Sequence, residues 1–165
     1  MMRIARQTDY AARLVLHLAS LGEEASASIA EIAQQRLLPV PFVRRMVAPL
    51  VAAGILKTTR GAKGGLQLGR PASAISLGDL VLAMEGPIAL NDCVHQPGAC
   101  PFRDHCPVQQ AWLGLSAALA EQLAAIRFDR LVGSAADAHA AAHAAMRKDG
   151  ARRSSKGRAR ARSHP

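Results

Sequence analysis

The segment between Ser28 and Gly54 constrains the fold more than any other part of the chain. Ser28 and Glu31 are spaced as a capping box, which predicts a short helix that continues through Arg36. After a tight turn, Pro41 suits the first position of a further helix, and Gly54 can end it. A short helix, a tight turn and a second helix together form the helix-turn-helix pattern.

A small basic hairpin is predicted directly after these two helices. Residues 55–60 and 66–68 are typical of short strands, and the turn between them is rich in glycine. A hairpin in this place is the wing of a winged helix. The sequence therefore predicts a mainly α fold with a small β-hairpin wing.

Further helices are predicted on both sides of this unit. Thr8 is expected to cap the first helix, and Ser76 the helix after the wing. Pro107 starts a long helix that should reach about Arg130, with apolar residues at every third or fourth position. A helix of about 20 residues spans ~30 Å, which is longer than the core of so small a domain requires. We therefore expect it to pair with a second copy in a homodimer, and packing within the monomer is the alternative.

Four segments follow from these predictions. We expect a winged helix-turn-helix DNA-binding domain in residues 1–85, a cysteine-bearing loop in 86–106, a dimerisation helix in 107–132, and an Ala-rich, then basic tail in 133–165. Residues 147–165 carry +7 of the formal charge of +9, so the rest is nearly balanced. The tail is expected to be disordered, because it has little apolar surface to bury. It either keeps the protein soluble or binds phosphates.

The start of the chain does not resemble a targeting segment. Charged side chains interrupt the first 21 residues, which argues against a signal peptide. No apolar run approaches the ~20 residues that a membrane span needs. We therefore expect a cytoplasmic protein without a membrane partner, in a compartment where thiols stay reduced.

The start of the second helix of the helix-turn-helix is the expected DNA-reading element. In such motifs this part enters the major groove. Here it carries Phe42, Arg44 and Arg45, and the two adjacent arginines point about 100° apart on the helix. One can reach a guanine edge while the other holds a phosphate, and the sequence does not decide which does which. A solvated arginine pair without a partner is the alternative.

The tip of the wing is the second expected DNA contact. Arg60 and Lys63 supply positive charge, and Gly61 with its neighbouring glycines lets the main chain approach the backbone or the minor groove. A double-stranded DNA operator is therefore the expected partner.

All three cysteines of the chain, Cys93, Cys100 and Cys106, lie in one short stretch. Three thiols in a reduced compartment suggest a metal or iron–sulfur site that lacks one ligand. Structural zinc, completed by His95 or His105, is a rival, although zinc ligands are usually closer in sequence. A bare thiol redox switch is another. No orienting group accompanies a Cys–His pair, so an enzyme is not expected.

Several motifs together resemble those of a known family. They are the glycine pattern of the wing from Arg60 to Gly65, the segment Leu68–Ala72 that follows, Thr8-Asp9-Tyr10 near the start, and the three-cysteine loop before a long helix. Over about residues 1–132 the chain resembles the IscR/NsrR-type (Rrf-two) iron–sulfur transcription regulators. The resemblance implies a homodimeric winged-helix repressor whose cluster responds to nitric oxide, oxidants or iron shortage.

The resemblance also suggests the missing ligand. IscR-like members have a histidine three residues after the last cysteine, where this chain has Gln109. NsrR-like members have an aspartate in the first helix that reaches the partner's cluster, and Asp9 matches it. The nitric-oxide-sensing branch is therefore favoured, with a 4Fe–4S cluster expected and 2Fe–2S possible. The alternative for Asp9 is a role in the first turn of a helix, where its charge favours the dipole.

Other functions remain open at this point. A regulator of the same family could sense iron, cluster supply or redox stress instead of nitric oxide. A zinc- or thiol-based DNA-binding regulator, or a DNA-free metal-binding or assembly protein with this fold, is the further alternative.

Overall fold

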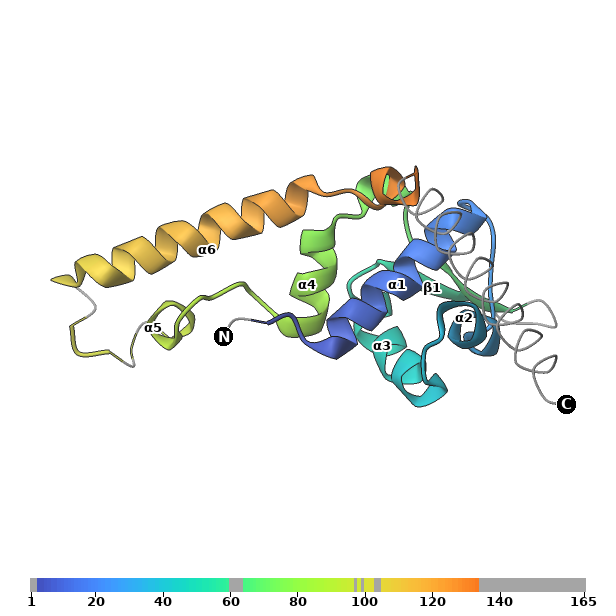
Figure 1. Cartoon of the computed structure of the whole chain (residues 1–165), viewed down its shortest axis with the longest axis horizontal. Coiled ribbons are helices and arrows are strands. Elements are labelled where there is room, and N and C mark those ends of the chain that lie inside the picture. Colours follow the sequence, from blue (N-terminus) through green and yellow to red (C-terminus); the bar gives the residue numbers. More distant parts are fainter. Residues whose placement is uncertain (1–2, 60–63, 97, 99, 103–104, 134–165) are drawn as a thin grey trace, which may run out of the picture. The chain divides into compact units, whose positions relative to one another are not determined.

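The computed structural model describes residues 3–59, 64–96, 98, 100–102 and 105–133. The chain divides into two compact units, Met1–Leu131 and Val132–Pro165. Every element named below lies in the first unit (Figure 1). The predicted wing tip and most of the Ala-rich and basic tail lie outside the described residues.

The first unit is mainly helical, with one two-stranded antiparallel sheet, which confirms the predicted fold class. Its elements in chain order are α1 (Arg6–Leu21), α2 (Ile29–Arg36), α3 (Val40–Ala52), β1 (Leu56–Thr59), β2 (Gly65–Leu68), the 3₁₀ helix η1 (Ala72–Ala74), α4 (Leu77–Glu85), α5 (Asp92–His95) and α6 (Pro107–Ala125).

The helix-turn-helix forms as its sequence predicts. The Ser28 amide donates to Glu31 Oε2 at 2.7 Å, and the Glu31 amide donates to Ser28 Oγ at 3.2 Å, which completes the capping box of α2. Leu37 ends α2 in the left-handed conformation, with φ of 53°. α3 begins at Val40, one residue before the predicted start at Pro41. The tight turn from Leu37 to Pro39 therefore determines the orientation of α3 relative to α2.

The start of α1 differs from the prediction. Thr8 does not cap the helix, which begins three residues earlier than expected, at Arg6. Ala5 is the N-cap residue, and its carbonyl accepts the amides of Thr8 and Asp9 at 2.9 and 3.2 Å. The Ala5 amide in turn donates to Glu85 Oε1 at 3.0 Å. The helix start is thus fixed by a tertiary contact with α4, which local sequence does not reveal.

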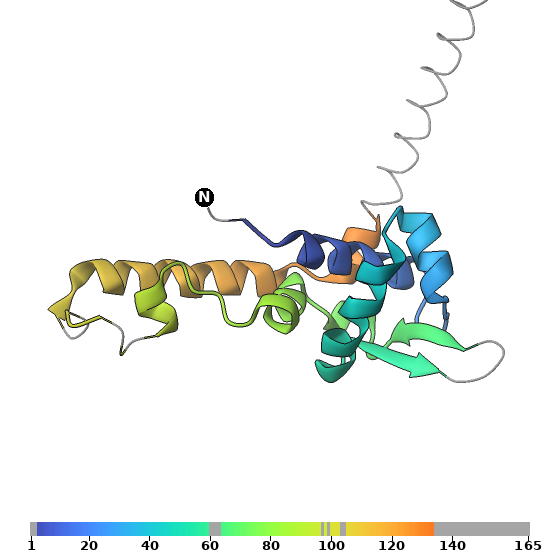
Figure 2. The same cartoon turned by 90° about the horizontal axis from the view of Figure 1, so that it is seen from below.

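The base of the wing is held by close backbone packing. β1 pairs with β2 from Leu56 opposite Leu68 to Thr59 opposite Gly65. Next to β2, Ala27 and Leu66 exchange backbone hydrogen bonds of 3.1 and 2.9 Å. A Cβ atom on Gly65 would lie 2.6 Å from the Ala27 carbonyl oxygen, so this approach requires glycine. The hairpin is therefore joined to the segment that leads into α2 (Figure 2).

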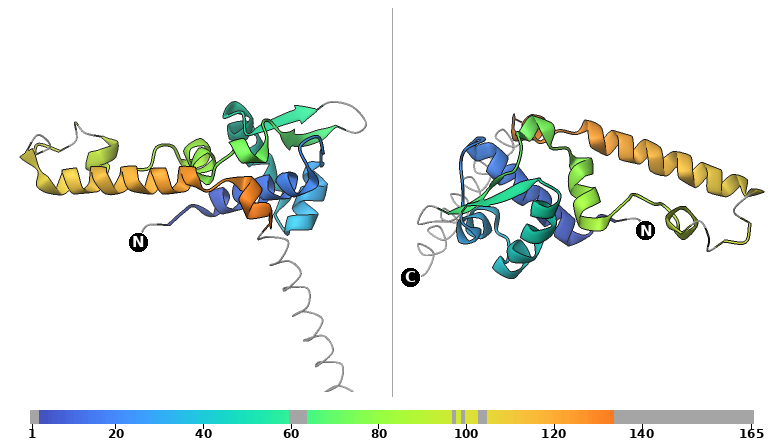
Figure 3. Two further views of the ribbon diagram at one scale, coloured as in Figure 1. Left: turned by 90° about the horizontal axis from the view of Figure 1, so that it is seen from above. Right: turned by 180° about the vertical axis from the view of Figure 1, so that it is seen from behind.

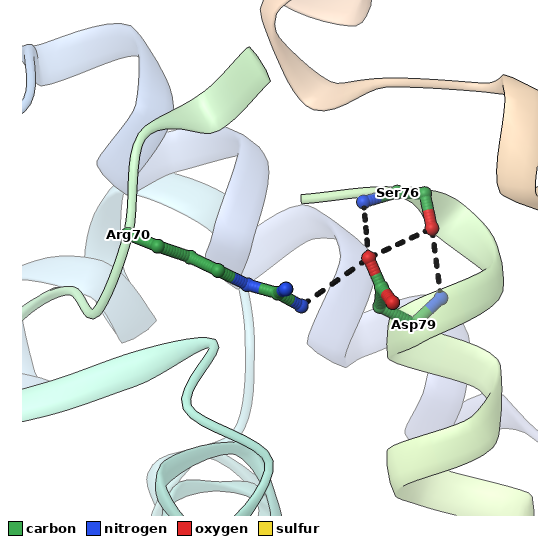
Figure 4. A network of polar contacts seen from close by, with 3 residues as sticks. All are labelled: Arg70, Ser76 and Asp79. Atoms are coloured by element: carbon green, nitrogen blue, oxygen red, sulfur yellow. Dashed lines mark hydrogen bonds and ion pairs between the residues drawn. The ribbon is translucent and has the colours of Figure 1, made fainter. Parts of the chain in front are cut away.

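α4 lies at the centre of the unit, in contact with α1, α3 and α6 (Figure 3). The Asp79 carboxylate accepts from the Ser76 amide and hydroxyl at 2.8 Å each and pairs with Arg70 at 3.2 Å (Figure 4). Burial alone would raise the pKa of Asp79, but the hydrogen bonds from Ser76 and the charges of Arg70 and Arg127 lower it below its usual value. This network fixes the start of α4 to the strand end that leaves the wing.

The C-terminal end of α6 differs most from the sequence expectation. The helix ends at Ala125 and does not continue to Arg130. The next residues are extended: the Leu77 amide donates to the Ile126 carbonyl at 2.8 Å, and the Phe128 amide donates to the Ile75 carbonyl at 3.0 Å. Helical structure resumes only at residue 128. The backbone pairing with the start of α4 therefore competes successfully with continuation of the helix.

Phe128 anchors this returning segment. Its side chain is 1 % exposed and belongs to the same apolar core as Leu14, Met46 and Leu80. At the same junction, a Cβ atom on Gly78 would lie 2.9 Å from the Ala124 backbone nitrogen. The end of α6 is thus packed closely against the winged-helix domain and shares its core.

Candidate functional site

α3 has one buried and one exposed face, as a reading helix requires. Val43, Met46 and Leu50 are fully buried and hold it on the core. Arg44 and Arg45, on the opposite side, are both exposed. In the part of the chain that the structure describes, Arg44 has no hydrogen bond or ion pair. The two cations are therefore available to a ligand at the N-terminal half of α3, where sequence analysis expects DNA contact.

Phe42 is half-buried and makes an edge-to-face aromatic contact with α1. Its ring meets that of Tyr10 edge-on, with 5.7 Å between the centroids and 84° between the planes. The Arg45 guanidinium lies 5.1 Å from the Phe42 centroid, and that of Arg13 lies 5.8 Å from the Tyr10 centroid. The sequence pattern indicates Phe42 and Arg45 as candidate DNA contacts, but it does not indicate that Tyr10 and Arg13 lie beside them. Only the fold brings these two α1 residues beside α3.

The predicted wing-tip residues Arg60, Gly61 and Lys63 lie outside the described residues. Their role in DNA contact stays a prediction.

The three cysteines are free and half-buried, and they occupy three different local settings. Cys93 lies within the short helix α5, which the sequence had not predicted. Cys100 lies in the loop that follows, and Cys106 is the N-cap residue of α6. α5 contacts α6, and the segment that leads from α4 to α5 lies beside that helix (Figure 2).

Two buried polar side chains of α6 hold this loop. Gln109 is 6 % exposed, and its Nε2 donates to the Cys93 carbonyl at 2.8 Å. Ser116 is 4 % exposed, and its Oγ accepts the Leu90 amide at 3.1 Å. Sequence analysis considered Gln109 only as the absence of a histidine ligand and did not single out Ser116. Two polar residues seven positions apart on one side of an apolar helix are the sequence signal from which this contact could have been predicted.

The donor chemistry of the loop fits a soft metal centre. Three free thiols of one loop are the ligands that iron–sulfur clusters and zinc use. Within the described residues of a single chain, however, no three His, Cys, Asp or Glu side chains lie close enough to hold a metal ion. The chain alone thus supplies suitable donors without bringing them together into a site.

Asp9 lies on α1 and already has a partner within the chain. Its Oδ2 is 2.9 Å from Arg13 Nη2, one helical turn further on, and its side chain is half exposed. It also lies in the first turn of α1, where its charge favours the helix dipole, as the simpler interpretation predicts. The structure shows this helix-start role, and a role as ligand stays a prediction.

Comparison with known proteins identifies the family. The model of the Rrf2 family, described as iron-dependent transcriptional regulators, matches residues 4–134. The chain belongs to the Rrf2 family. The predicted family is therefore confirmed, while the NsrR branch within it stays a prediction.

Individual Rrf2-like proteins agree with this assignment. The chain is 38 % identical over 137 residues to Protein aau3 of Rhizobium meliloti, covering 82 % of this chain and 83 % of that protein. Protein rrf2 of Nitratidesulfovibrio vulgaris is 32 % identical over 111 residues, covering 67 % and 74 %. The solved structure of CymR (YrzC), the global cysteine regulator of B. subtilis, is 29 % identical with a TM-score of 0.67, covering 81 % of this chain and 98 % of that one.

The family also decides the broad class of function. Rrf2 proteins are DNA-binding transcription regulators with a winged-helix fold, so this chain is a transcription regulator and not an enzyme. No helix within the described ranges has both the length and the hydrophobicity needed to span a bilayer.

The outer face of α6 is apolar and uncovered in this Rrf2 chain. Val108 is 58 % exposed and Leu115 is 53 % exposed, Leu119 is exposed as well, and Ile126 just after the helix is also exposed. Gln109 and Ser116, in contrast, lie on the face that holds the cysteine loop. α6 therefore presents one face to its own loop and leaves an apolar stripe without a partner within the described chain.

Proposed function

We propose that this protein is a homodimeric transcriptional repressor whose operator affinity is controlled by an iron–sulfur cluster. Cys93, Cys100 and Cys106 would hold the cluster, with Asp9 of the partner subunit as fourth ligand. The observation that carries the proposal is the connectivity of α6. One end of this helix holds the cysteine loop through Gln109, and the other end is packed into the winged-helix core.

The dimer follows from the uncovered stripe on α6. Val108, Leu115 and Leu119 recur at the spacing of a helix seam, and large exposed apolar residues in a row mark an interaction surface. Pairing of two α6 helices would remove this stripe from water. It would also bring the cysteine loop of one chain towards elements of the other, which is what a ligand from a second subunit requires.

The protein groups around the thiols determine how a cluster would be held. Gln109 and Ser116 fix the backbone of the loop, so they orient Cys93 without using a thiol. To become a ligand, Asp9 would have to leave its ion pair with Arg13. A bound cluster, favoured as 4Fe–4S, would supply reactivity towards nitric oxide or oxidants. A carboxylate is a weak iron ligand beside thiolates, so this position would be the easiest to open.

The state of the cluster would be transmitted to the DNA-binding helix α3 through two helices, α6 and α1. The extended segment after α6 pairs with the start of α4, so displacement of α6 would be transmitted to the domain that carries α3. α1 carries Asp9 and packs against α3. Loss of the cluster would release both constraints and move the two reading helices of the dimer off their half-site spacing.

The Asp9 ligand has a specific test. Asp9→Ala should leave the protein folded, because the exposed ion pair with Arg13 contributes only about 0–1 kcal/mol. We expect it to change the visible absorption and electron-paramagnetic-resonance spectra of anaerobically purified protein, and to alter their response to nitric oxide. Asp92→Ala, which removes an exposed carboxylate beside Cys93, is the matched control and should leave the spectra unchanged. Spectra of Asp9→Ala that match the wild type would reject this ligand.

Iron supply is the second candidate signal, favoured by the description of the family as iron-dependent. The two signals act on different things: nitric oxide reacts with a cluster that is already bound, whereas iron supply determines whether a cluster is bound at all. Nitric oxide should bleach the cluster of the loaded protein within one anaerobic titration, whereas an iron-supply sensor should change occupancy only when iron is withheld or chelated.

A further inference from the structure

The edge-to-face pair of aromatic rings between α1 and α3 has one arginine guanidinium next to each ring. Tyr10 and Phe42 meet edge to face, Arg13 lies over the Tyr10 ring, and Arg45 lies over the Phe42 ring. Asp9 pairs with Arg13 at 2.9 Å, a contact that a ligand role of Asp9 would remove, so the proposal below does not depend on it. The contacts form a continuous array from the start of α1 to the exposed side of α3.

The contact with Phe42 restricts the side chain of Arg45, which would otherwise be free to change rotamer. An exposed arginine on a helix samples many rotamers, and binding must pay for ordering it. Arg45 instead has its planar guanidinium against an aromatic ring, an arrangement that arginine favours. Its neighbour Arg44 has no such contact among the described residues. The two adjacent arginines therefore differ in how far each is ordered before DNA arrives.

The ring that orders Arg45 is itself held from another helix. Phe42 lies in the first turn of α3 and is only half-buried, so the α3 backbone alone leaves its χ angles several choices. The Tyr10 ring edge, supplied by α1, restricts these choices. Tyr10 is half-buried as well, and its place in the fold is next to the reading helix, outside the fully buried centre of the core.

We propose that Tyr10 is a positioning residue for DNA recognition: it orients the Phe42 ring, and Phe42 in turn holds Arg45 ready to contact the operator. This proposal rests on the assignment of α3 as the reading helix. Tyr10 acts through its ring and does not itself have to touch DNA.

A double-mutant cycle with Tyr10→Leu and Arg45→Ala tests the proposal, read as operator affinity by fluorescence anisotropy at one fixed salt concentration. Tyr10→Leu should weaken operator binding about three- to tenfold, the size expected from loss of an aromatic pair and the cation it orders. In the Arg45→Ala background, Tyr10→Leu should have no further effect, because the residue on which it acts is gone. Circular dichroism and thermal unfolding establish that each variant is folded.

Tyr10→Phe is the matched control. It keeps the ring and removes only the hydroxyl, so it should bind like the wild type. If Tyr10→Phe is as weak as Tyr10→Leu, the hydroxyl is the important group and the positioning role is wrong. If the effects of Tyr10→Leu and Arg45→Ala simply add, Tyr10 does not act through Arg45, and the proposal also fails.

The outcomes separate this proposal from the broader one. If Arg45→Ala alone leaves affinity unchanged, Arg45 is not used for DNA contact and the positioning role falls, whereas the assignment of α3 as the reading helix falls only if replacing Arg44 and Arg45 together also leaves affinity unchanged. If Arg45→Ala weakens binding but Tyr10→Leu does not, only the positioning role is overturned. Should Tyr10→Leu fail to fold, Phe42→Leu replaces it in the same cycle, with the same expectation of no further effect beside Arg45→Ala.

Discussion

Replacing both Arg44 and Arg45 by alanine should abolish specific operator binding at physiological salt while leaving the fold intact. A bidentate arginine–guanine contact contributes about 1–3 kcal/mol of base discrimination, which is ~5–150-fold in affinity. Loss of a phosphate contact should lower affinity for all sequences and reduce the salt dependence of binding by about one unit of slope. Both side chains are exposed, so the core that holds α3 is not disturbed.

The measurement is operator and non-operator binding of each single variant and the double variant across a salt series. The base-reading arginine is the one whose loss relaxes specificity, and the phosphate-binding arginine is the one whose loss reduces the salt slope. Arg130→Ala is the control, since it removes the same charge after α6, away from α3. Unchanged operator affinity in the double variant would contradict the assignment of α3.

Phe128→Ala should cause the largest loss of stability of any single change considered for this chain. The side chain is 1 % exposed within the core, and truncation of a buried phenylalanine costs about 3–5 kcal/mol. Total stabilities are about 5–15 kcal/mol, so this is a large fraction. Because Phe128 also anchors the segment after α6, its loss should loosen α6 from the winged-helix domain.

Phe102→Ala provides a matched control for this effect. Phe102 is 74 % exposed in the cysteine loop, so the same truncation should change the free energy of unfolding by no more than about 0.5 kcal/mol. Urea unfolding of both variants, followed by circular dichroism, gives the comparison. A cost below about 1 kcal/mol for Phe128→Ala would show that the end of α6 is not part of the core.

Local signals in the sequence were sufficient for the winged helix-turn-helix. The Ser28–Glu31 capping box, the Gly54 stop and the glycine-rich hairpin are all encoded within a few residues of where they act. The same holds for Ser76 and Asp79 at the start of α4. Such features are predictable because the hydrogen bonds that stabilise them join residues close in sequence.

The predicted start of α1 and end of α6 were wrong because contacts between segments distant in sequence determine both. The start of α1 depends on Glu85, and the end of α6 depends on backbone bonds to Ile75 and Leu77, roughly fifty residues away in sequence. The apolar series that suggested the longer helix ran as far as Ile126, and Phe128 beyond it is buried against the winged-helix core and not along a continuous helix. Periodicity alone does not distinguish these two modes of burial.

The three thiols of the cysteine loop could be recognised from the sequence, but the contacts that hold this loop could not. Three thiols in one loop were evident from spacing, whereas the hydrogen bonds of Gln109 and Ser116 to that loop required the packed helix. The edge-to-face contact of Tyr10 with Phe42 could not be predicted either, because the two residues are thirty-two positions apart in the sequence and only the fold brings them together.

Whether occupancy of the cysteine site controls DNA binding can be tested directly by comparing the operator affinity of the loaded and the iron-free protein. Anaerobically purified protein with its visible absorption intact, and the same protein after removal of iron, would be titrated with one operator at one salt concentration. The account predicts that the loaded form binds about 5–150-fold more tightly, the range of an allosteric coupling of 1–3 kcal/mol. Equal affinity of the two forms would contradict it.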